Sequence, residues 1–212
     1  MATHAVLEAL GIDYHLVEID LSKGEQKSAG YLAINPNGKV PTLVHDKYVI
    51  YESAAILLYL LDQHPESSLA PPIQNAKRGH YYQYMFWMSN TLQEAANRWA
   101  HPEYYLADES AKHQIGHVGD RQSNLDLIVE KATQELMRCW GVLEADLAKK
   151  GPWLLGDILS GADYHLFMLT YWSRRYGSRA QDYPYLNAHI RAMLNLESIQ
   201  VMMQQEALEF DL

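Results

Sequence analysis

The sequence of 212 residues contains a single cysteine, Cys139, so it can form neither an internal disulfide nor a zinc site built from several thiolates. Basic residues are also scarce: 17 lysines and arginines stand against 26 aspartates and glutamates, which gives a net charge of −9. Broad binding to nucleic acid or to an anionic membrane needs a basic surface. We therefore expect neither a nucleic-acid nor a membrane partner.

Long apolar runs are absent as well. No stretch approaches the roughly 18 apolar residues of a membrane-spanning helix, and the first residues lack the basic segment and apolar core of a signal peptide. Hydrophobic residues make up 48% and charged residues 20% of the chain, as in soluble globular proteins. With the lone cysteine, these features lead us to expect a cytoplasmic protein with one large or two modest domains.

The most informative stretch of the chain runs from 35 to 56. It opens with the turn-forming residues Asn-Pro-Asn-Gly at 35–38, and a short apolar run follows at 42–45. A second run at 48–51 comes after a two-residue break, although that break lacks the favoured glycine. This pattern predicts a β-hairpin.

Two residue pairs flank this hairpin. Pro41 stands at the start of the first strand, where its missing amide proton does no harm, so the backbone amide and carbonyl of Val40 are free for another partner. Glu52 and Ser53 stand at the start of a predicted helix that runs to about residue 63. Acidic and hydroxyl side chains are favoured at helix starts for structural reasons alone, but the same helix end attracts anions. Glu52 and Ser53 can therefore start the helix and take part in ligand binding at the same time.

Elsewhere the pattern is helical, with one exception. We expect a strand over 14–20 from its alternating side chains. The expected helices are, in order, 3–10 (ended by Gly11), a weak one within 22–32, 76–100, 121–149, one that opens at Ser160 and runs through Trp172, 184–194 and 197–208. Proline-rich residues separate the two halves. The expected organisation is therefore an α/β domain (1–66), a linker (67–75) and an all-helical domain (76–212).

Ser160 and Asp163 carry a structural signal. Their spacing matches a capping box, with Leu159 and Tyr164 placed as a hydrophobic staple around it. We expect these residues to start a helix and to bind no ligand.

The run NPNGKVPTL at 35–43 followed by YESAAILLYL at 51–60 resembles the glutathione-binding core of the bacterial-like, cytosolic glutathione transferases, and WLLGD at 153–157 resembles their buried capping motif. The resemblance implies a thioredoxin-like first domain followed by an all-α domain, a homodimer, and glutathione as co-substrate with a small hydrophobic electrophile. It implies that Pro41 is cis, that Val40 exchanges backbone hydrogen bonds with the cysteinyl part of glutathione, and that Glu52 and Ser53 hold the γ-glutamyl group.

The family's first strand, and the catalytic residue just after it, have no counterpart in this sequence, whose first residues resemble the following helix. Three explanations are open: the true start lies upstream, the neighbouring strands at 14–20 and 42–45 pair directly, or a partner chain supplies a strand. We favour the first and expect the catalytic residue upstream of Met1. Thr3 is only a weak candidate to replace it, because Thr3 and His4 more often cap a helix or lie exposed.

The remaining candidates are weaker. Lys39 is next to Val40 and is a weak candidate for binding glutathione, but a lysine in a turn is more often simply solvated. His113 and His117 have helical metal spacing without a third ligand, so no metal is expected. Cys139 is expected to be a buried, inert thiol. The function favoured is glutathione conjugation, and the alternatives are a non-catalytic binding protein or an isomerase or dehalogenase of the same fold.

Overall fold

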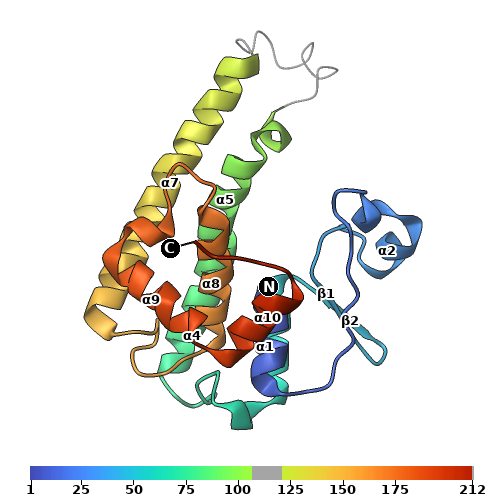
Figure 1. Ribbon diagram of the computed structural model, residues 1–212, viewed down its shortest axis with the longest axis vertical. Helices are drawn as coiled ribbons and strands as arrows, with labels where there is room; N and C mark the ends of the chain where they lie inside the picture. Colours follow the sequence, from blue (N-terminus) through green and yellow to red (C-terminus); the bar gives the residue numbers. More distant parts are fainter. Residues whose placement is uncertain (107–120, 212) are drawn as a thin grey trace.

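The computed structural model describes residues 1–106 and 121–211, and a small lobe with α2 and the β-hairpin stands beside a helical body (Figure 1). The first part of the chain forms α1 (Ala2–Leu10), η1 (Glu25–Lys27), α2 (Ala29–Ile34), β1 (Thr42–His45), β2 (Tyr48–Tyr51), α3 (Ser53–Gln63) and η2 (Pro65–Ser67). The body contains α4 (Lys77–Trp87), the π-helical η3 (Met88–Leu92), α5 (Gln93–Ala100), η4 (Pro102–Tyr105), α7 (Arg121–Lys150), α8 (Gly161–Ser173), η6 (Ala180–Asp182), α9 (Pro184–Leu194) and α10 (Glu197–Gln205).

The expected helices and hairpin are present because local signals define them. Gly11 ends α1 with a φ of 61°, a left-handed conformation that glycine adopts without steric cost. The residues from 77 to 100 are helical throughout, although the central turn η3 is a π-helix rather than an α-helix. This fold, a small sheet with helices followed by a helical region, is the one the sequence predicted.

The predicted strand over 14–20 is wrong. Residues 12–20 form no regular element, and Leu16 and Val17 are exposed. The described sheet has two strands, β1 and β2, so 14–20 has no ladder of hydrogen bonds to join. The alternative in which 14–20 pairs directly with 42–45 is therefore contradicted, because within the described residues β1 pairs only with β2.

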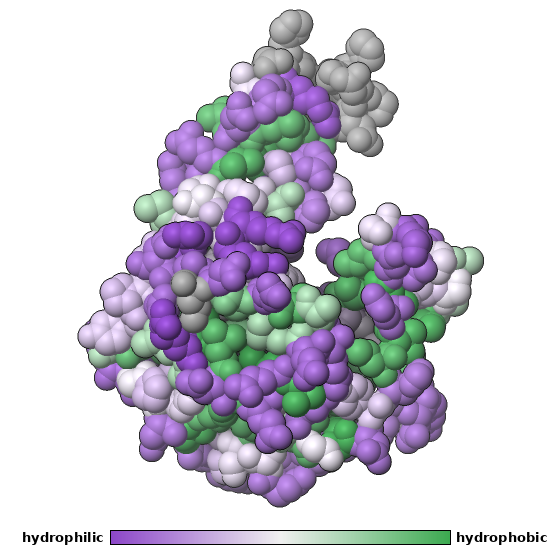
Figure 2. Space-filling view, viewed as in Figure 1, coloured by the Kyte–Doolittle hydropathy of each residue, from purple (hydrophilic) through white to green (hydrophobic). Residues whose placement is uncertain are grey.

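The hairpin has two different faces. β1 and β2 pair antiparallel, with Thr42 opposite Tyr51 and Leu43 opposite Ile50. Leu43 and Ile50 pack against the core, whereas the opposite face exposes Val44 and its cross-strand partner. Figure 2 shows apolar surface on this lobe. The hairpin is thus anchored to the body through one face.

Helix α8 lies at the centre of the body (Figure 1). All of its residues except Trp172 are buried, and neighbouring helices on several sides enclose it. Its first residue, Gly161, lies so close to α3 and α4 that an added Cβ atom would meet Leu61 Cδ1 at 2.5 Å and Tyr81 Oη at 2.8 Å. A residue without a side chain is therefore required at this point.

Asp163 fixes the start of α8. The reciprocal contacts of a capping box join it to Ser160, whose amide and hydroxyl both donate to Asp163 Oδ2 at 2.9 Å. Asp163 Oδ1 accepts the Leu154 amide at 2.9 Å and His189 Nε2 at 3.1 Å. The carboxylate is completely buried, so these four donors replace the water it gives up on folding.

Arg78 fixes the irregular segment between α3 and α4. Its guanidinium donates to the Pro71 carbonyl at 2.8 Å and pairs with Asp62 near the end of α3. The side chain is buried and also lies over the ring of Tyr82. The boundaries at 66 and 76 between the two halves stay predictions. Within 1–106 and 121–211, no helix is both long and apolar enough to cross a membrane.

We expect Gly161→Ala to lower the free energy of unfolding by about 1–3 kcal/mol, because Leu61 and Tyr81 are themselves fully enclosed and cannot move away. Urea denaturation followed by circular dichroism measures this. Gly141→Ala in α7 is the matched control: an added Cβ there meets no atom within 4 Å, so the helix should gain about 0.5–1 kcal/mol. Equal effects at the two positions would contradict the packing argument.

His165 in α8 generates a pH-dependent prediction. Its ring is fully buried, neither nitrogen has a partner among the described residues, and burial lowers its pKa to about 4. The folded pKa lies below the usual histidine value of 6.5, so the neutral buried ring contributes its full stability above pH 6.5, and this contribution is lost as the pH falls toward 4. Between pH 7.5 and 5 the loss should be about 2 kcal/mol.

The measurement compares urea denaturation of the protein and of His165→Leu across this range. Leucine removes the titrating ring, so the variant should lose less stability on acidification by about that amount. Parallel pH profiles for the two proteins would show that His165 is not the group responsible.

Candidate functional site

The register of the hairpin brings the two candidate pairs together. Thr42 is the first residue of β1 and lies opposite Tyr51, the last residue of β2. Neighbouring strands lie about 5 Å apart, so the residues just outside this pair, Val40-Pro41 and Glu52-Ser53, meet at the same end of the hairpin. The Asp46-Lys47 turn lies at the other end.

A polar network fixes the loop that leads to Val40. The Asn35 side chain is buried and donates through Nδ2 to the Lys39 carbonyl at 2.8 Å and to Thr42 Oγ1 at 3.0 Å. Tyr31 on α2 donates to the same carbonyl at 2.7 Å. Asn35 Oδ1 accepts the Asn37 amide at 3.0 Å, which closes the turn. These bonds hold the chain on both sides of Val40-Pro41.

Gly38 completes this turn for two reasons. Its φ of 56° is unfavourable for residues with a Cβ atom. A Cβ atom would also lie 2.8 Å from the Gln26 carbonyl and 2.7 Å from Lys27 Nζ. The Asn-Pro-Asn-Gly turn therefore packs directly on η1, and Lys27 Nζ donates to the Asn37 carbonyl at 3.2 Å.

The backbone at Val40 presents two unused groups. The Val40-Pro41 peptide bond is cis. Within the described residues, neither the amide nor the carbonyl of Val40 makes a hydrogen bond, and the residue is 43% exposed. A free backbone donor and a free backbone acceptor on the same residue are what an extended peptide needs to dock by backbone pairing.

Glu52 has a backbone conformation that the sequence did not reveal. Its φ is 74°, which is rare for a residue with a side chain and costs on the order of 1–3 kcal/mol. Its carbonyl accepts the Ile56 amide, so Glu52 is the residue that begins α3. The side chain is exposed and has no partner among the described residues. An unpaired carboxylate on strained backbone is typical of a functional position.

The first turn of α3 provides unpaired donors. Its amides at 53–55 precede the first intrahelical bond, which is made by Ile56, and no side chain caps them. The partial positive charge of a helix N-terminus favours an anion at this point. The Ser53 hydroxyl lies in the same turn and is half-buried. The site therefore offers one negative recognition element, the Glu52 carboxylate, and one positive element, the N-terminus of α3.

The remaining candidates fall in different places. Lys39 is exposed, and its carbonyl rather than its ammonium belongs to the Asn35 network. Thr3 is 91% buried in α1, and its hydroxyl has no partner among the described residues. The expectation that Thr3 and His4 would cap the helix or lie exposed is therefore wrong.

His4 joins the two ends of the chain. Its Nδ1 lies 2.8 Å from Glu206 Oε1, and its Nε2 lies 2.7 Å from the Tyr14 hydroxyl. Glu206 also pairs with the α-amino group of Met1 at 2.8 Å. The Tyr14 hydroxyl donates in turn to Glu8, and burial, with the contribution of that carboxylate, raises the Tyr14 pKa to about 12. Sequence reasoning missed this network because its members are up to 202 residues apart.

Cys139 and the paired histidines do not contribute to the site. Cys139 is fully buried in α7, and burial with the nearby Glu135 carboxylate raises its pKa to about 11, so its thiol is unreactive near neutral pH. His113 and His117 lie outside the described residues. Within the described residues, no group of three or more potential ligand side chains is arranged to hold a metal ion.

Two protein-family models match this chain. The model of the glutathione S-transferase N-terminal domain matches residues 1–62, which include the entire hairpin site. The model of the C-terminal domain matches residues 116–197. Together the two stretches make up more than half of the chain. It belongs to the glutathione S-transferase family.

Relatives of this family member include more than one type of protein. Glutathione S-transferase GST-4.5 of Xanthomonas campestris pv. campestris is 28% identical over 208 residues, which cover 98% of this chain and 94% of the relative. The disulfide-bond oxidoreductase YfcG of Escherichia coli is 28% identical over 164 residues, or 74% of this chain and 67% of YfcG.

Solved structures show the same fold. A glutathione transferase homologue from Sulfitobacter, crystallised with bound glutathione, superposes with a TM-score of 0.84 at 23% identity, covering 98% of this chain and 93% of the homologue. The ternary complex of BphK, a bacterial glutathione S-transferase, superposes with a TM-score of 0.78 at 28% identity, covering 98% and 94%.

The strained backbone of Glu52 leads to a stability prediction. We expect Glu52→Gly to be about 1 kcal/mol more stable than Glu52→Ala, because only glycine adopts the positive φ without steric cost. Chemical denaturation of both variants measures the difference. Glu66 is the control position: it does not have a positive φ, so glycine there should be less stable than alanine. The same order at both positions would mean that the backbone of Glu52 is unstrained.

Proposed function

We propose that this glutathione S-transferase family member binds glutathione at the open end of the hairpin. The observation that carries the proposal is the pairing of Thr42 with Tyr51, which brings the free backbone of Val40 beside the start of α3. Glutathione has a matching set of groups: a cysteinyl residue with backbone donor and acceptor, and a γ-glutamyl end with a carboxylate and an ammonium.

Each part of the tripeptide has a partner in this proposal. The amide and carbonyl of Val40 pair with the cysteinyl backbone. The Glu52 carboxylate receives the γ-glutamyl ammonium, and the amides of α3 with the Ser53 hydroxyl receive the γ-glutamyl carboxylate. Lys39 plays a minor part at most, because its position is exposed and its role in the loop is through its carbonyl.

We further propose that the bound glutathione attacks a small hydrophobic electrophile. The thiolate sulfur supplies the electron pair of the new S–C bond, and the leaving group departs with the pair of the bond that breaks. The protein's part is to hold the tripeptide so that its sulfur is positioned for attack. We assign the role of lowering the thiol pKa to none of the described residues.

Two other functions fit the same binding site. One is binding without turnover. The other is different glutathione chemistry in the same fold, such as the isomerase or dehalogenase reactions anticipated above or the disulfide-bond oxidoreductase activity for which YfcG is named. The buried Cys139 argues against a mechanism that uses a cysteine of this chain. A homodimer stays a prediction, which the sedimentation mass of the purified chain would check.

We expect Glu52→Gln to weaken glutathione binding about tenfold and Ser53→Ala about fivefold, since the first loses a charge-assisted contact and the second a neutral hydrogen bond. Isothermal titration calorimetry measures the affinities, and circular dichroism checks that the fold survives. Glu130→Gln on the exposed face of α7 removes an equal charge from a different helix and should leave the affinity unchanged. Unchanged affinity in both site variants would eliminate the γ-glutamyl assignment.

Turnover separates the candidate functions. Product formation from glutathione and a generic aromatic halide, followed by absorbance, supports conjugation. A protein that is retained on immobilised glutathione but gives no product with this electrophile supports binding alone. Reduction of a glutathione-containing disulfide without conjugation would support the oxidoreductase alternative.

A further inference from the structure

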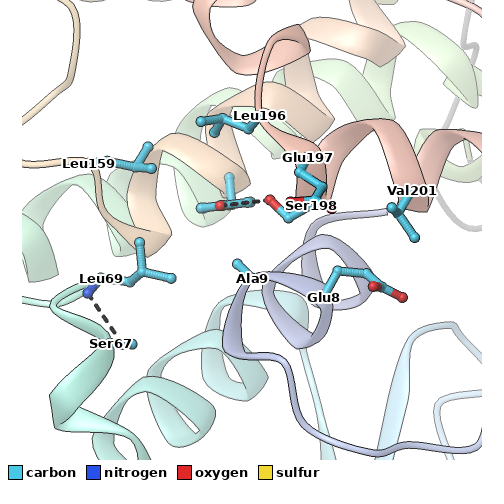
Figure 3. A pocket seen from close by; sticks show the side chains of 10 residues that line it. Glu8, Ala9, Ser67, Leu69, Leu159, Leu196, Glu197, Ser198 and Val201 are labelled. Atoms are coloured by element: carbon cyan, nitrogen blue, oxygen red, sulfur yellow. Dashed lines mark hydrogen bonds between the residues drawn. The ribbon is translucent and has the colours of Figure 1, made fainter.

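A cavity lies away from the hairpin. Its volume is about 480 Å³, and its walls come from the end of α1, from η2 and the residues after it, from the start of α8 and from the first half of α10. Figure 3 shows Glu8 and Ala9 on α1 facing Glu197, Ser198 and Val201 on α10 across this space. The cavity thus lies where the first and last helices of the chain come together.

This cavity is separate from the proposed glutathione site. Helix α3 begins at the site with Ser53 and spans eleven residues to Gln63, which corresponds to about 16 Å of helix. The cavity wall at Ser67 and Leu69 follows that far end. Within α1 the cavity is likewise lined by Glu8 and Ala9, the last turn of the helix rather than its first. The cavity therefore lies at the end of α3 that is distant from the hairpin site.

The side chains around the cavity have one sign of charge. Glu8 and Glu197 contribute carboxylates, and none of the described lining residues is basic. Glu197 is exposed, has no partner among the described residues, and lies in the first turn of α10. Glu8 Oε1 accepts the Tyr14 hydroxyl and, at 3.2 Å, Gln205 Nε2, and His4 Nε2 lies 3.8 Å from the same oxygen, whereas Oε2 has no partner among the described residues. Two anionic groups therefore border the same space.

The other walls complete an amphipathic site. Tyr164 is almost fully buried, and its hydroxyl lies 3.0 Å from Ser198 Oγ, so this pair presents two oxygens that accept hydrogen bonds. Leu69, Leu159 and Val201 supply aliphatic surface. A pocket with an apolar wall and a few convergent polar groups is the usual form of a small-molecule site. Here the charged groups are anions, and the hydroxyl pair can accept hydrogen bonds as well as donate one.

We propose that this cavity binds an amphipathic organic cation, a primary ammonium or guanidinium with an apolar body. The cationic head lies against Glu8 and Glu197, where its charge is complementary, and donates to the hydroxyl pair of Tyr164 and Ser198. The apolar body lies against Leu69, Leu159 and Val201. This site is independent of the proposed glutathione function and does not require it.

Isothermal titration with three probes of one shape tests the charge requirement. The probes are 4-phenylbutylammonium, 4-phenylbutan-1-ol and 4-phenylbutyrate. We expect the ammonium to bind about tenfold more tightly than the alcohol, the carboxylate to bind most weakly, and the preference to shrink as salt is added. Equal affinities for the three probes would overturn the proposal.

Variants locate the binding. Glu197→Gln should weaken the ammonium probe about threefold, and the double variant with Glu8→Gln about tenfold. Glu130→Gln is the matched control and should have no effect. Val201→Trp fills the space and should abolish binding of all three probes. A Glu197→Gln variant with the affinity of Glu130→Gln would contradict the assignment.

Saturating glutathione separates this site from the first one. The affinity for 4-phenylbutylammonium should be the same with and without glutathione, and the same in Glu52→Gln. Competition between the probe and glutathione would place the probe at the hairpin and overturn the second site. A failure of the protein to bind glutathione would leave the probe result intact, so the two proposals can fail separately.

Discussion

The structure depends on one buried carboxylate. Asp163 receives hydrogen bonds from the Leu154 amide, from the amide and hydroxyl of Ser160, and from the His189 ring. These donors belong to the turn before α8, to the start of α8 itself and to α9. Removing the carboxylate would leave several buried donors unpaired, which costs far more than the loss of one exposed contact. Because α8 is surrounded by the other helices, a loss of these hydrogen bonds at its start would disturb the packing of the whole body.

The candidate site is held by a different kind of constraint. Its recognition groups are mostly backbone atoms, so the conformation of the chain matters more than the identity of the side chains. Asn35 and Tyr31 fix the carbonyl just before Val40, and the pairing of Thr42 with Tyr51 sets the distance to Glu52. The positive φ of Glu52 sets the direction in which α3 starts. This conformation has a steric cost, which the packing of the surrounding fold offsets. Substitutions that leave Val40 and Glu52 unchanged can therefore still disturb the site.

Local signals were enough to predict most of the fold and the positions of the candidate residues around the hairpin. The hairpin, the glycine after α1 and the capping box of α8 each depend on residues within a few positions, and so does the placement of Val40 and Glu52 beside the hairpin. The strand expected over 14–20 failed because a strand exists only if another strand pairs with it, which alternation alone does not show. Local sequence could not predict the φ of Glu52 or the contact of His4 with Glu206 either, because tertiary packing determines both.

The contact of His4 with Glu206 connects the two ends of α1 electrostatically. Glu8 borders the cavity and accepts the Tyr14 hydroxyl, and Tyr14 contacts His4, which contacts Glu206 and through it the Met1 ammonium. Burial, followed by the Glu8 carboxylate, raises the Tyr14 pKa to about 12. A cation placed against Glu8 would offset part of that negative charge and so would lower the Tyr14 pKa. By linkage, ionisation of Tyr14 would in turn strengthen binding of the cation. The polar contacts of α1 thus form one continuous chain from its cavity end at Glu8 to its first turn at His4.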